Sequence, residues 1–351
     1  MNNLKHTLVE LGKWFNEEAI LNEDLLKSAE AHNGWFTKDS VVTAMSNHAS
    51  MLSSGSVSAW FDENGIDDSS LESNGKTLGL ITAGNIPLVG WHDMLCGLVC
   101  GFNISVKASR DDQILPRAVV SKLEEINPEL KSRITFLEGK LGEVDAVIAT
   151  GSANTARYFE LYFSHLPHVF RSQRTGVAVL DGNESDEDLC KLGDDMFTHF
   201  GLGCRSTTKI FLPEGFDIDR CFAQWVKWGE IGNHNKYANN YDYHKAIWLL
   251  NGEDLLENGF LLVKKDSGWV SPVGTIFVEF YNDLDSITTR IADYAEGIQV
   301  VTTRKNWGDF LKILNSKSSE LPIHKFGLAQ CPKVDDYADR VNTVKFLQGI
   351  E

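Results

Sequence analysis

Short apolar runs alternate with helix-length segments between residues 77 and 163, and this alternation restricts the fold more than any other feature of the sequence. The predicted strands are 77–82, 103–108, 134–137 and 144–149. Predicted helices run from Pro87 to about Cys100, from Asp111 or Asp112 to about Glu125, and from Gly151 to about Phe163. Strands that alternate with helices of this length predict βαβ units and a parallel sheet. The sequence therefore predicts an α/β fold.

Three polar or glycine-bearing segments follow strands of this predicted sheet. They are Gly84-Asn85, Lys107-Ala108-Ser109 and Thr150-Gly151-Ser152. Ligands of open parallel sheets bind beyond the carboxyl ends of the strands, so these segments are candidate binding residues. The chain has no Gly-x-Gly-x-x-Gly motif, which argues against a standard Rossmann dehydrogenase.

Periodicity and turn residues predict the regions around this core. Residues 3–52 are predicted to be helical, with a break at Asn33-Gly34 and a new helix that is capped by Thr37 or Asp39. A loop is predicted at 53–56, and a polar connector is predicted at 62–76. Later strands are predicted at 176–180, 209–212, 260–264, 274–280 and 298–303, and helices at 184–200, 217–228, 284–294 and 307–314. Residues 229–245 are rich in Asn, Tyr and His, which predicts a surface loop or part of a substrate entrance. We expect one domain over 1–175, a second over 176–330 and a C-terminal tail over 331–351.

A lone cysteine, Cys204, stands in a predicted turn with glycines one and three residues before it. The apolar stripe of the preceding helix ends at Phe200, and a run that can be extended, 207–212, follows the turn. Glycines at this point would end the helix and let the backbone approach a ligand. A loop between two rigid elements presents a thiol as a nucleophile needs, so Cys204 is a candidate nucleophile. The alternative is a buried structural cysteine.

Composition argues against several kinds of partner and site. The 351 residues carry a net charge of −16, whereas nucleic acids and anionic membranes are bound by clustered Lys and Arg. Six scattered cysteines, without Cys-x-x-Cys pairs or His clusters, predict neither a disulfide framework nor a metal site, and they fit a reducing cytoplasm. The acidic N-terminal segment does not resemble a signal peptide, and no apolar stretch is long enough for a transmembrane helix.

Four segments follow one another in an order that is similar to that of a known superfamily. They are Gly84-Asn85-Ile86-Pro87, Val106-Lys107-Ala108-Ser109, Thr150-Gly151-Ser152 and Gly201-Leu202-Gly203-Cys204. They resemble the Asn-Phe-Pro-like turn, Lys-Pro-Ser-like strand end, Thr-Gly-Ser helix start and Gly-Gln-x-Cys-like loop of the aldehyde dehydrogenase superfamily. The resemblance covers roughly residues 33–329 and is strongest to the acyl-CoA reductase branch, the LuxC-like family. It implies a Rossmann-type parallel-sheet cofactor domain, preceded by the N-terminal helices, and an α/β catalytic domain that carries the cysteine.

The resemblance also implies roles for individual residues. Cys204 matches the nucleophile that takes the acyl group as a thioester, and Asn85 matches the amide that helps to form the oxyanion hole. Lys107, with Ser109 beside it, matches the strand end that binds the cofactor ribose, and Gly151-Ser152 matches the helix start that approaches the pyrophosphate. Apart from the resemblance, Asn85 could be only a turn residue, Lys107 a solvated strand end and Ser152 only an N-cap.

Two carboxylates of oxidising aldehyde dehydrogenases have no counterpart here. Their water-activating Glu lies in a Glu-Leu-Gly-Gly-Lys stretch, which matches Phe170-Arg171-Ser172-Gln173-Arg174. Their ribose-binding Glu lies in Glu-Ile-Phe-Gly-Pro-Val, which matches Gly268-Trp269-Val270-Ser271-Pro272-Val273. Hydrolysis of a thioester needs the first Glu, whereas reduction of a thioester does not. We therefore expect an acyl-CoA reductase that uses NADPH, or NADH, to convert a fatty acyl-CoA or other acyl thioester to the aldehyde.

Other interpretations stay open at this point. The chain could reduce an acyl phosphate, as the semialdehyde branches of the superfamily do, or it could be a catalytically silent scaffold or partner-binding subunit. Arg171, Arg174 and Arg205 could lower the pKa of Cys204 or hold a CoA phosphate, or they could pair with acids at the surface. A homo-oligomer or an acyl-supplying partner protein is also compatible with the sequence.

Overall fold

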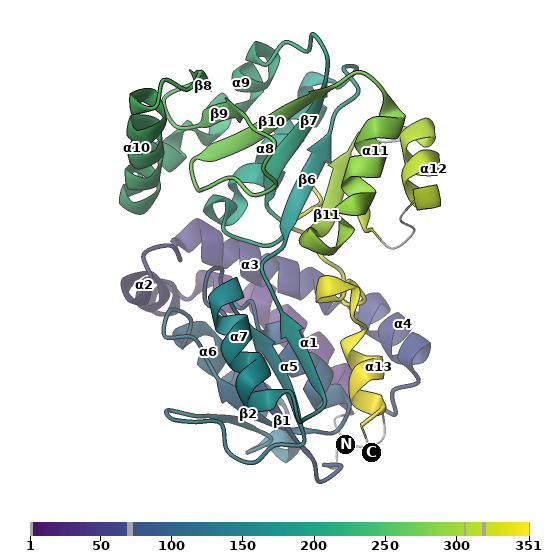
Figure 1. Cartoon of the computed structure of the whole chain (residues 1–351). Coiled ribbons are helices and arrows are strands. Elements are labelled where there is room, and N and C mark those ends of the chain that lie inside the picture. The colour runs from purple at the N-terminus through teal and green to yellow at the C-terminus, as the bar shows by residue number, and fades with distance from the viewer. Residues whose placement is uncertain (1–2, 69–72, 305–306, 318–320, 351) are drawn as a thin grey trace. The chain divides into compact units, whose positions relative to one another are not determined.

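The computed structural model describes residues 3–68, 73–304, 307–317 and 321–350, with the backbone alone at 153 and 309. The chain divides into two compact units (Figure 1). The first comprises Met1–Gln173 and Pro332–Glu351, and the second comprises Arg174–Cys331. Each unit has its own sheet, and each is described by itself.

The first unit is an open sheet with helices on both faces. Its strands are β1 (Thr77–Ile81), β2 (Asn103–Lys107), β3 (Ile134–Phe136), β4 (Ala146–Thr150) and β5 (His168–Arg171). Its helices are α1 (Leu4–Glu17), α2 (Glu23–His32), α3 (Lys38–Met51), α4 (Ser54–Asn64), α5 (Trp91–Val99), α6 (Ile114–Ile126), α7 (Ala153–Phe163) and α13 (Thr343–Gln348). The strand order is β3-β2-β1-β4-β5 and all four strand pairs are parallel, which confirms the predicted βαβ alternation.

The alternation of side chains along β4 shows which helices cover which face. Ala146 and Ile148 belong to the core that α5 and α6 share with α1–α4 and α13. Val147 and Ala149 pack against Phe159 of α7. Because successive strand side chains point to opposite faces, α7 covers one face of the sheet, and α5 and α6 cover the other. Both faces of the central strands are therefore buried, as parallel sheets require.

Several predicted boundaries in this unit are wrong. The predicted loop at 53–56 is the start of α4, with Ser53 as its N-cap residue. Helix α5 begins at Trp91 and not at Pro87, because a turn with Leu88 at a positive φ of 59° comes first. Strand β5 was not predicted, because four residues that include a His and an Arg carry little apolar signal.

The second unit is a larger, mostly parallel sheet. Its strands are β6 (Thr175–Val179), β7 (Thr207–Pro213), β8 (Leu255–Glu257), β9 (Leu262–Lys265), β10 (Thr275–Tyr281), β11 (Ile298–Thr303) and β12 (Ile323–Lys325). Its helices are α8 (Asp186–Phe197), α9 (Asp219–Trp225), α10 (Asn235–Leu250), α11 (Leu284–Asp293) and α12 (Gly308–Lys317). The strand order is β12-β11-β6-β7-β10-β9-β8, so β7 is the central strand. Among the strand pairs of the described residues, only β8 and β9 are antiparallel.

Helices cover this sheet as well. Val177, Val179 and Phe211 form a core with Ile287 and Ile291 of α11, and α11 lies beside α12 (Figure 1). Helices α8 and α9 pack together, and the indole of Trp225 donates a hydrogen bond of 2.9 Å to the carbonyl of Leu189.

The predicted surface loop at 229–245 is wrong, because residues 235–250 form helix α10. The imidazole of His234 caps this helix by accepting the N–H of Tyr237 at 3.3 Å. Tyr237 and Tyr241 are four residues apart and both are buried, so they lie on the side of the helix that faces the core. Two buried aromatic rings thus outweigh the weak helix propensity of the Asn residues around them.

Candidate active site

The five candidate residues of the first unit lie at one edge of its sheet. Asn85 follows β1, Lys107 is the last residue of β2, Ser109 comes two residues later, and Gly151-Ser152 follow β4. The chain adds β2 and then β3 on one side of β1, and it later adds β4 and then β5 on the other side of β1. The point at which the strand order reverses therefore lies between β1 and β4. Ligands of such sheets bind in the crevice at this carboxyl edge. The first unit therefore brings these five residues to the expected edge.

A buried carboxylate holds the turn that follows Asn85. Leu88 has a left-handed φ of 59°, and its N–H donates a hydrogen bond of 2.8 Å to Oδ2 of Asp112. Asp112 is 3 % exposed, and burial raises its pKa to about 7. The prediction that Asp111 or Asp112 caps α6 is wrong, because Gln113 occupies the N-cap position. Asn85 itself is exposed on this turn.

Lys107 and Ser109 differ in what their side chains do. Lys107 is exposed at the strand end. The N–H of Ser109 donates to Thr82 Oγ1 at 3.3 Å, and its hydroxyl accepts the N–H of Asp111 at 3.2 Å. A Cβ on Gly84 would lie 2.7 Å from the Ser109 hydroxyl, so only glycine fits against this turn. Ser109 thus shapes the edge, while Lys107 presents a charge there.

Helix α7 starts at the same edge. Ser152 is its N-cap, and its hydroxyl accepts the N–H of Thr155 at 3.4 Å. A Cβ on Gly151 would collide with the Thr155 hydroxyl, so the backbone at Gly151 packs closely against the first turn of α7. The first N–H groups of a helix, together with its dipole, attract anions such as phosphate.

In the second unit, Cys204 lies in the turn that leads into the central strand β7. Helix α8 begins with a capping box between Ser185 and Asp188, and it ends at Phe197. His199, Phe200 and Gly201 then follow with left-handed φ values of 53°, 59° and 73°. The predicted helix end at Phe200 is therefore wrong, because the helix ends at Phe197 and the left-handed conformation already begins at His199, before the glycine.

The cysteine turn itself is tight. The N–H of Ser206 donates to the carbonyl of Gly203 at 3.0 Å, and the N–H of Gly203 donates to the Ser206 hydroxyl at 3.2 Å. Cys204, between these two residues, is half-buried. Its thiol is thus held in a turn with a defined backbone conformation.

A later segment of the chain clamps this turn. Arg205 donates to the carbonyl of Ala329 at 3.4 Å, and the Gln330 amide donates to the Ser206 hydroxyl at 3.1 Å. The carboxylate of Asp195, at the end of α8, accepts the N–H groups of Gly327 and Ala329 at 2.8 and 2.9 Å. Sequence reasoning missed Asp195 and this segment, because Asp195 and the N–H groups that it binds lie more than a hundred residues apart along the chain.

Another residue that sequence reasoning missed is His199. Its side chain is buried, and burial lowers its pKa to about 4. The imidazole near the cysteine turn is therefore neutral at physiological pH.

The three arginines near the predicted site have structural partners. Arg171 belongs to the first unit, where it is buried against Asp93 with donor–acceptor distances of 2.6 and 3.0 Å. Its ion pair with Asp93 is therefore buried and does not lie at the surface. Arg174 lies 3.7 Å from Glu296, and Arg205 is buried in the clamp described above.

The described ranges also bear on metal and membrane binding. They contain no group of three His, Cys, Asp or Glu side chains arranged to hold a metal ion. Within the same ranges, no helix is long and apolar enough to cross a membrane.

Comparisons with known proteins place the fold. No family model matches the chain, and no curated protein matches it. Solved structures do match. Aldehyde dehydrogenase 21 from Physcomitrella patens, in complex with succinate, has a TM-score of 0.69 and a sequence identity of 13 %. This match covers 98 % of this chain and 82 % of the Physcomitrella chain. The chain has the aldehyde dehydrogenase fold. An aldehyde dehydrogenase from Mycobacterium tuberculosis, complexed with NAD⁺, matches with a TM-score of 0.65 at 13 % identity over 92 % of this chain and 76 % of that chain.

Betaine aldehyde dehydrogenase from Staphylococcus aureus, also in complex with NAD⁺, has a TM-score of 0.65 at 11 % identity over 92 % of this chain and 74 % of its own. These neighbours confirm the predicted aldehyde dehydrogenase-like fold.

Proposed function

We propose that this aldehyde dehydrogenase-like chain is an NADPH-dependent oxidoreductase that reduces a fatty acyl-CoA, or another acyl thioester, to the aldehyde. The observation that carries the proposal is a half-buried thiol in the turn before the central strand, combined with no carboxylate in the segments that match the two glutamates. The first of these segments, 170–174, contains the last residues of β5 and the boundary between the two units. Its Arg171 is paired with Asp93, and a guanidinium stays protonated, so it cannot act as the base that activates water in place of a glutamate.

The carboxyl edge of the first sheet fits a nicotinamide dinucleotide. Gly84 packs against Ser109 and Gly151 packs against Thr155, so a side chain on either glycine would displace the turns that form this edge. The free N–H groups of α7 would hold the pyrophosphate, and the exposed Lys107 would bind ribose hydroxyls or a 2′-phosphate. Once bound, this cofactor would supply the hydride.

The protein side chains would carry out acyl transfer. The Cys204 thiolate attacks the acyl carbonyl, the C–S bond to coenzyme A breaks, and the coenzyme leaves as its thiolate. The amide of Asn85 and the N–H of Cys204 would stabilise the oxyanion. After reduction, the hemithioacetal loses its C–S bond to Cys204, so the aldehyde leaves and the thiol returns. Because Cys204 and Asn85 belong to different units, their meeting at one carbonyl is part of the proposal.

Two substrates separate this proposal from its nearest alternative. The assay follows aldehyde formation and NADPH oxidation with an acyl-CoA and with the corresponding acyl phosphate. We expect turnover of the acyl-CoA, and a loss of at least about 10²-fold in Asn85→Ala as for other oxyanion donors. Turnover of the acyl phosphate alone would favour the semialdehyde-type reaction instead.

The absence of both glutamates also supports a catalytically silent scaffold, which would keep the fold without the reaction. Titration calorimetry with NADPH and NADP⁺ tests this alternative. We expect binding of at least one of them, whereas no binding of either would favour the scaffold.

A further inference from the structure

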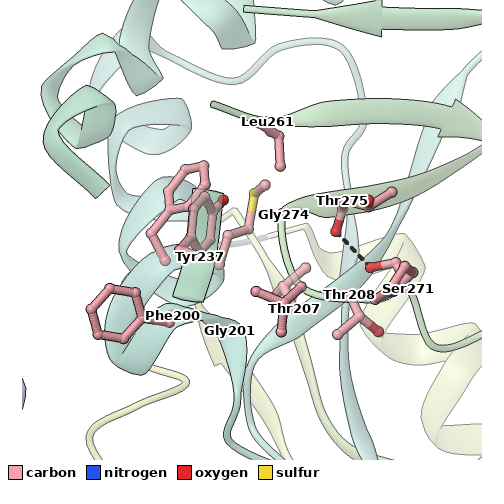
Figure 2. Close-up of a pocket in the computed structure, with 13 residues that line it drawn as sticks. Phe200, Gly201, Thr207, Thr208, Tyr237, Leu261, Ser271, Gly274 and Thr275 are labelled. Carbon is pink, nitrogen blue, oxygen red and sulfur yellow. Dashed lines mark hydrogen bonds between the residues drawn. The ribbon is translucent and has the colours of Figure 1, made fainter. Parts of the chain in front are cut away.

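The two peptide groups that flank Gly203 decide where the N–H of Cys204 points. Glycine has the least restricted backbone of all residues, and Gly203 stands directly before the candidate nucleophile. Gly201 and Thr207, which lie before and after the cysteine turn, line one small pocket, so the chain enters and leaves the turn close together (Figure 2). A glycine in such a short loop needs contacts from other residues to keep one conformation.

One residue, Ser206, binds both of these peptide groups. Its N–H donates to the carbonyl of Gly203 at 3.0 Å, and its hydroxyl accepts the N–H of Gly203 at 3.2 Å. The carbonyl belongs to the peptide group that joins Gly203 to Cys204, and the N–H belongs to the peptide group that joins Leu202 to Gly203. Because peptide groups are planar, these two bonds restrain both rotatable backbone bonds of the glycine.

The bond to the carbonyl fixes the direction of the Cys204 N–H. In a trans peptide group the C=O and the N–H point in opposite directions, and the described part of the chain contains no cis peptide bond. The carbonyl of Gly203 points across the turn to the N–H of Ser206. The N–H of Cys204 therefore points away from the inside of the turn, where it can donate to a group that lies outside the turn.

Ser206 is itself anchored to the sheet and to the segment 327–330. It is fully buried, and its carbonyl accepts the N–H of Gly176 on β6 at 2.9 Å. The amide of Gln330 donates to its hydroxyl at 3.1 Å. Rotation of the Ser206 side chain would break this bond together with the bond to Gly203, so the hydroxyl is held in one rotamer. The conformation of the cysteine turn thus depends on a residue that is fixed through its backbone and its side chain.

A fixed N–H beside a thiol matters for acyl transfer but not for alkylation. When a thiolate attacks a carbonyl carbon, the carbonyl oxygen takes up negative charge, and a donor that already points to this oxygen stabilises the charge. When a thiolate attacks an alkyl halide, the C–S bond forms as the halide leaves, and no oxyanion forms. A comparison of the two reactions therefore separates the direction of the N–H from the reactivity of the thiol.

We propose that Ser206 is a positioning residue for acyl transfer, which holds the N–H of Cys204 in the direction of the oxyanion. Ser206 acts through the two peptide groups of Gly203 and does not touch the substrate, while Gln330 keeps its hydroxyl in place. The inference rests on the proposed function, because it takes Cys204 as the nucleophile and its N–H as an oxyanion donor. It adds the residue that gives this donor its direction.

The test compares two reactions of Cys204 in the full chain without cofactor. p-Nitrophenyl acetate acetylates a thiol and releases nitrophenolate, whereas iodoacetamide alkylates a thiol and releases iodide. Mass spectrometry of the peptide that contains Cys204 gives both rates, and their ratio cancels any change in the thiolate fraction. We expect Ser206→Ala to lower the ratio of acetylation to alkylation about tenfold or more, because a misdirected donor loses part of the roughly 10²–10³-fold that one oxyanion donor contributes.

Thr303→Val is the matched control, because the buried Thr303 hydroxyl donates to the carbonyl of Val179 at 2.9 Å. This variant also removes one buried hydrogen bond from the second unit, and it should leave the ratio unchanged. If Ser206→Ala does not fold, Gln330→Met decides the question. It keeps the Ser206 hydroxyl but removes the donor that holds it, so it should lower the ratio about threefold or more, as expected for one neutral hydrogen bond.

Three results would overturn the inference. They are an unchanged ratio in Ser206→Ala, an equal fall of the ratio in Thr303→Val, and a wild-type Cys204 that takes no acetyl group. In the first two cases Ser206 would serve only the fold. Failure of the proposed function gives a different result, in which p-nitrophenyl acetate acetylates Cys204 and Ser206→Ala lowers the ratio, but an acyl-CoA leaves no adduct on the wild type.

Discussion

Asp195 shows how one buried carboxylate can position a candidate nucleophile without touching it. It is fully buried at the end of α8, and it accepts two N–H groups of segment 327–330. This segment in turn contacts Arg205 through Ala329 and Ser206 through Gln330. Burial raises its pKa to about 7 from an ordinary value of 3.8, although two backbone N–H groups oppose the shift. The charge of this carboxylate therefore changes close to neutral pH.

The raised pKa predicts a pH-dependent stability. Between pH 3.8 and about 7, the folded protein keeps a proton on Asp195 that the unfolded chain has lost, so the free energy of unfolding should fall as pH rises through this window. Asp195→Asn keeps one acceptor oxygen and cannot titrate, so it should flatten this dependence. Urea unfolding at intervals from pH 4.5 to about 7.5 measures both curves.

Asp112 contributes to the same slope in the wild type and in Asp195→Asn, because burial raises its pKa to about 7 as well. The difference between the two curves therefore reports Asp195 alone. Parallel curves would show that Asp195 does not titrate in this range. The variant also loses one of two hydrogen bonds, which should cost about 1 kcal/mol at the acid end.

At the scale of elements, a buried ion pair ties three parts of the first unit together. The guanidinium of Arg171 on β5 binds Asp93 of α5 and donates to Thr343 of α13 at 2.9 Å and to the carbonyl of Ala338 at 2.6 Å. Every partner of this cation is thus in place, which satisfies the condition for keeping a charge buried.

Removal of one partner should be costly, because it leaves the other charge buried and unpaired. We expect Asp93→Ala to lower the free energy of unfolding by about 3–5 kcal/mol. The double variant Asp93→Leu with Arg171→Met removes both charges and should recover much of that loss. A double-mutant cycle in urea measures the coupling, and an Asp93→Ala cost below about 1 kcal/mol would argue against a tight pair.

The elements also show where sequence patterns suffice. The strands and helices from 77 to 163 were predicted because each apolar run is bounded by glycine or polar turns. Helix α10 was not predicted, because only Tyr237 and Tyr241 of its sixteen residues are buried and its Asn-rich composition is typical of a loop. Its status as a helix depends on tertiary packing of these two rings, which local composition does not report.

At the scale of the whole molecule, sequence order predicted the fold correctly. Four short segments in the right order led to an aldehyde dehydrogenase-like fold, and structures at 11–13 % identity share it. Asn85, Lys107 and Gly151 could be placed at a sheet edge in advance, because strand ends follow from the apolar runs. The clamp around Cys204 and the neutral His199 could not, because they depend on contacts and burial that involve residues far apart in sequence.

The central claim is that Cys204 carries an acyl group, and mass spectrometry of the intact chain tests it most directly. Wild type and Cys204→Ala are each incubated with an acyl-CoA, without cofactor, and modified peptides are then sequenced. We predict one acyl adduct on the peptide that contains Cys204 in the wild type and none in Cys204→Ala. A wild-type chain without an adduct, or an adduct that persists in Cys204→Ala, would contradict the account.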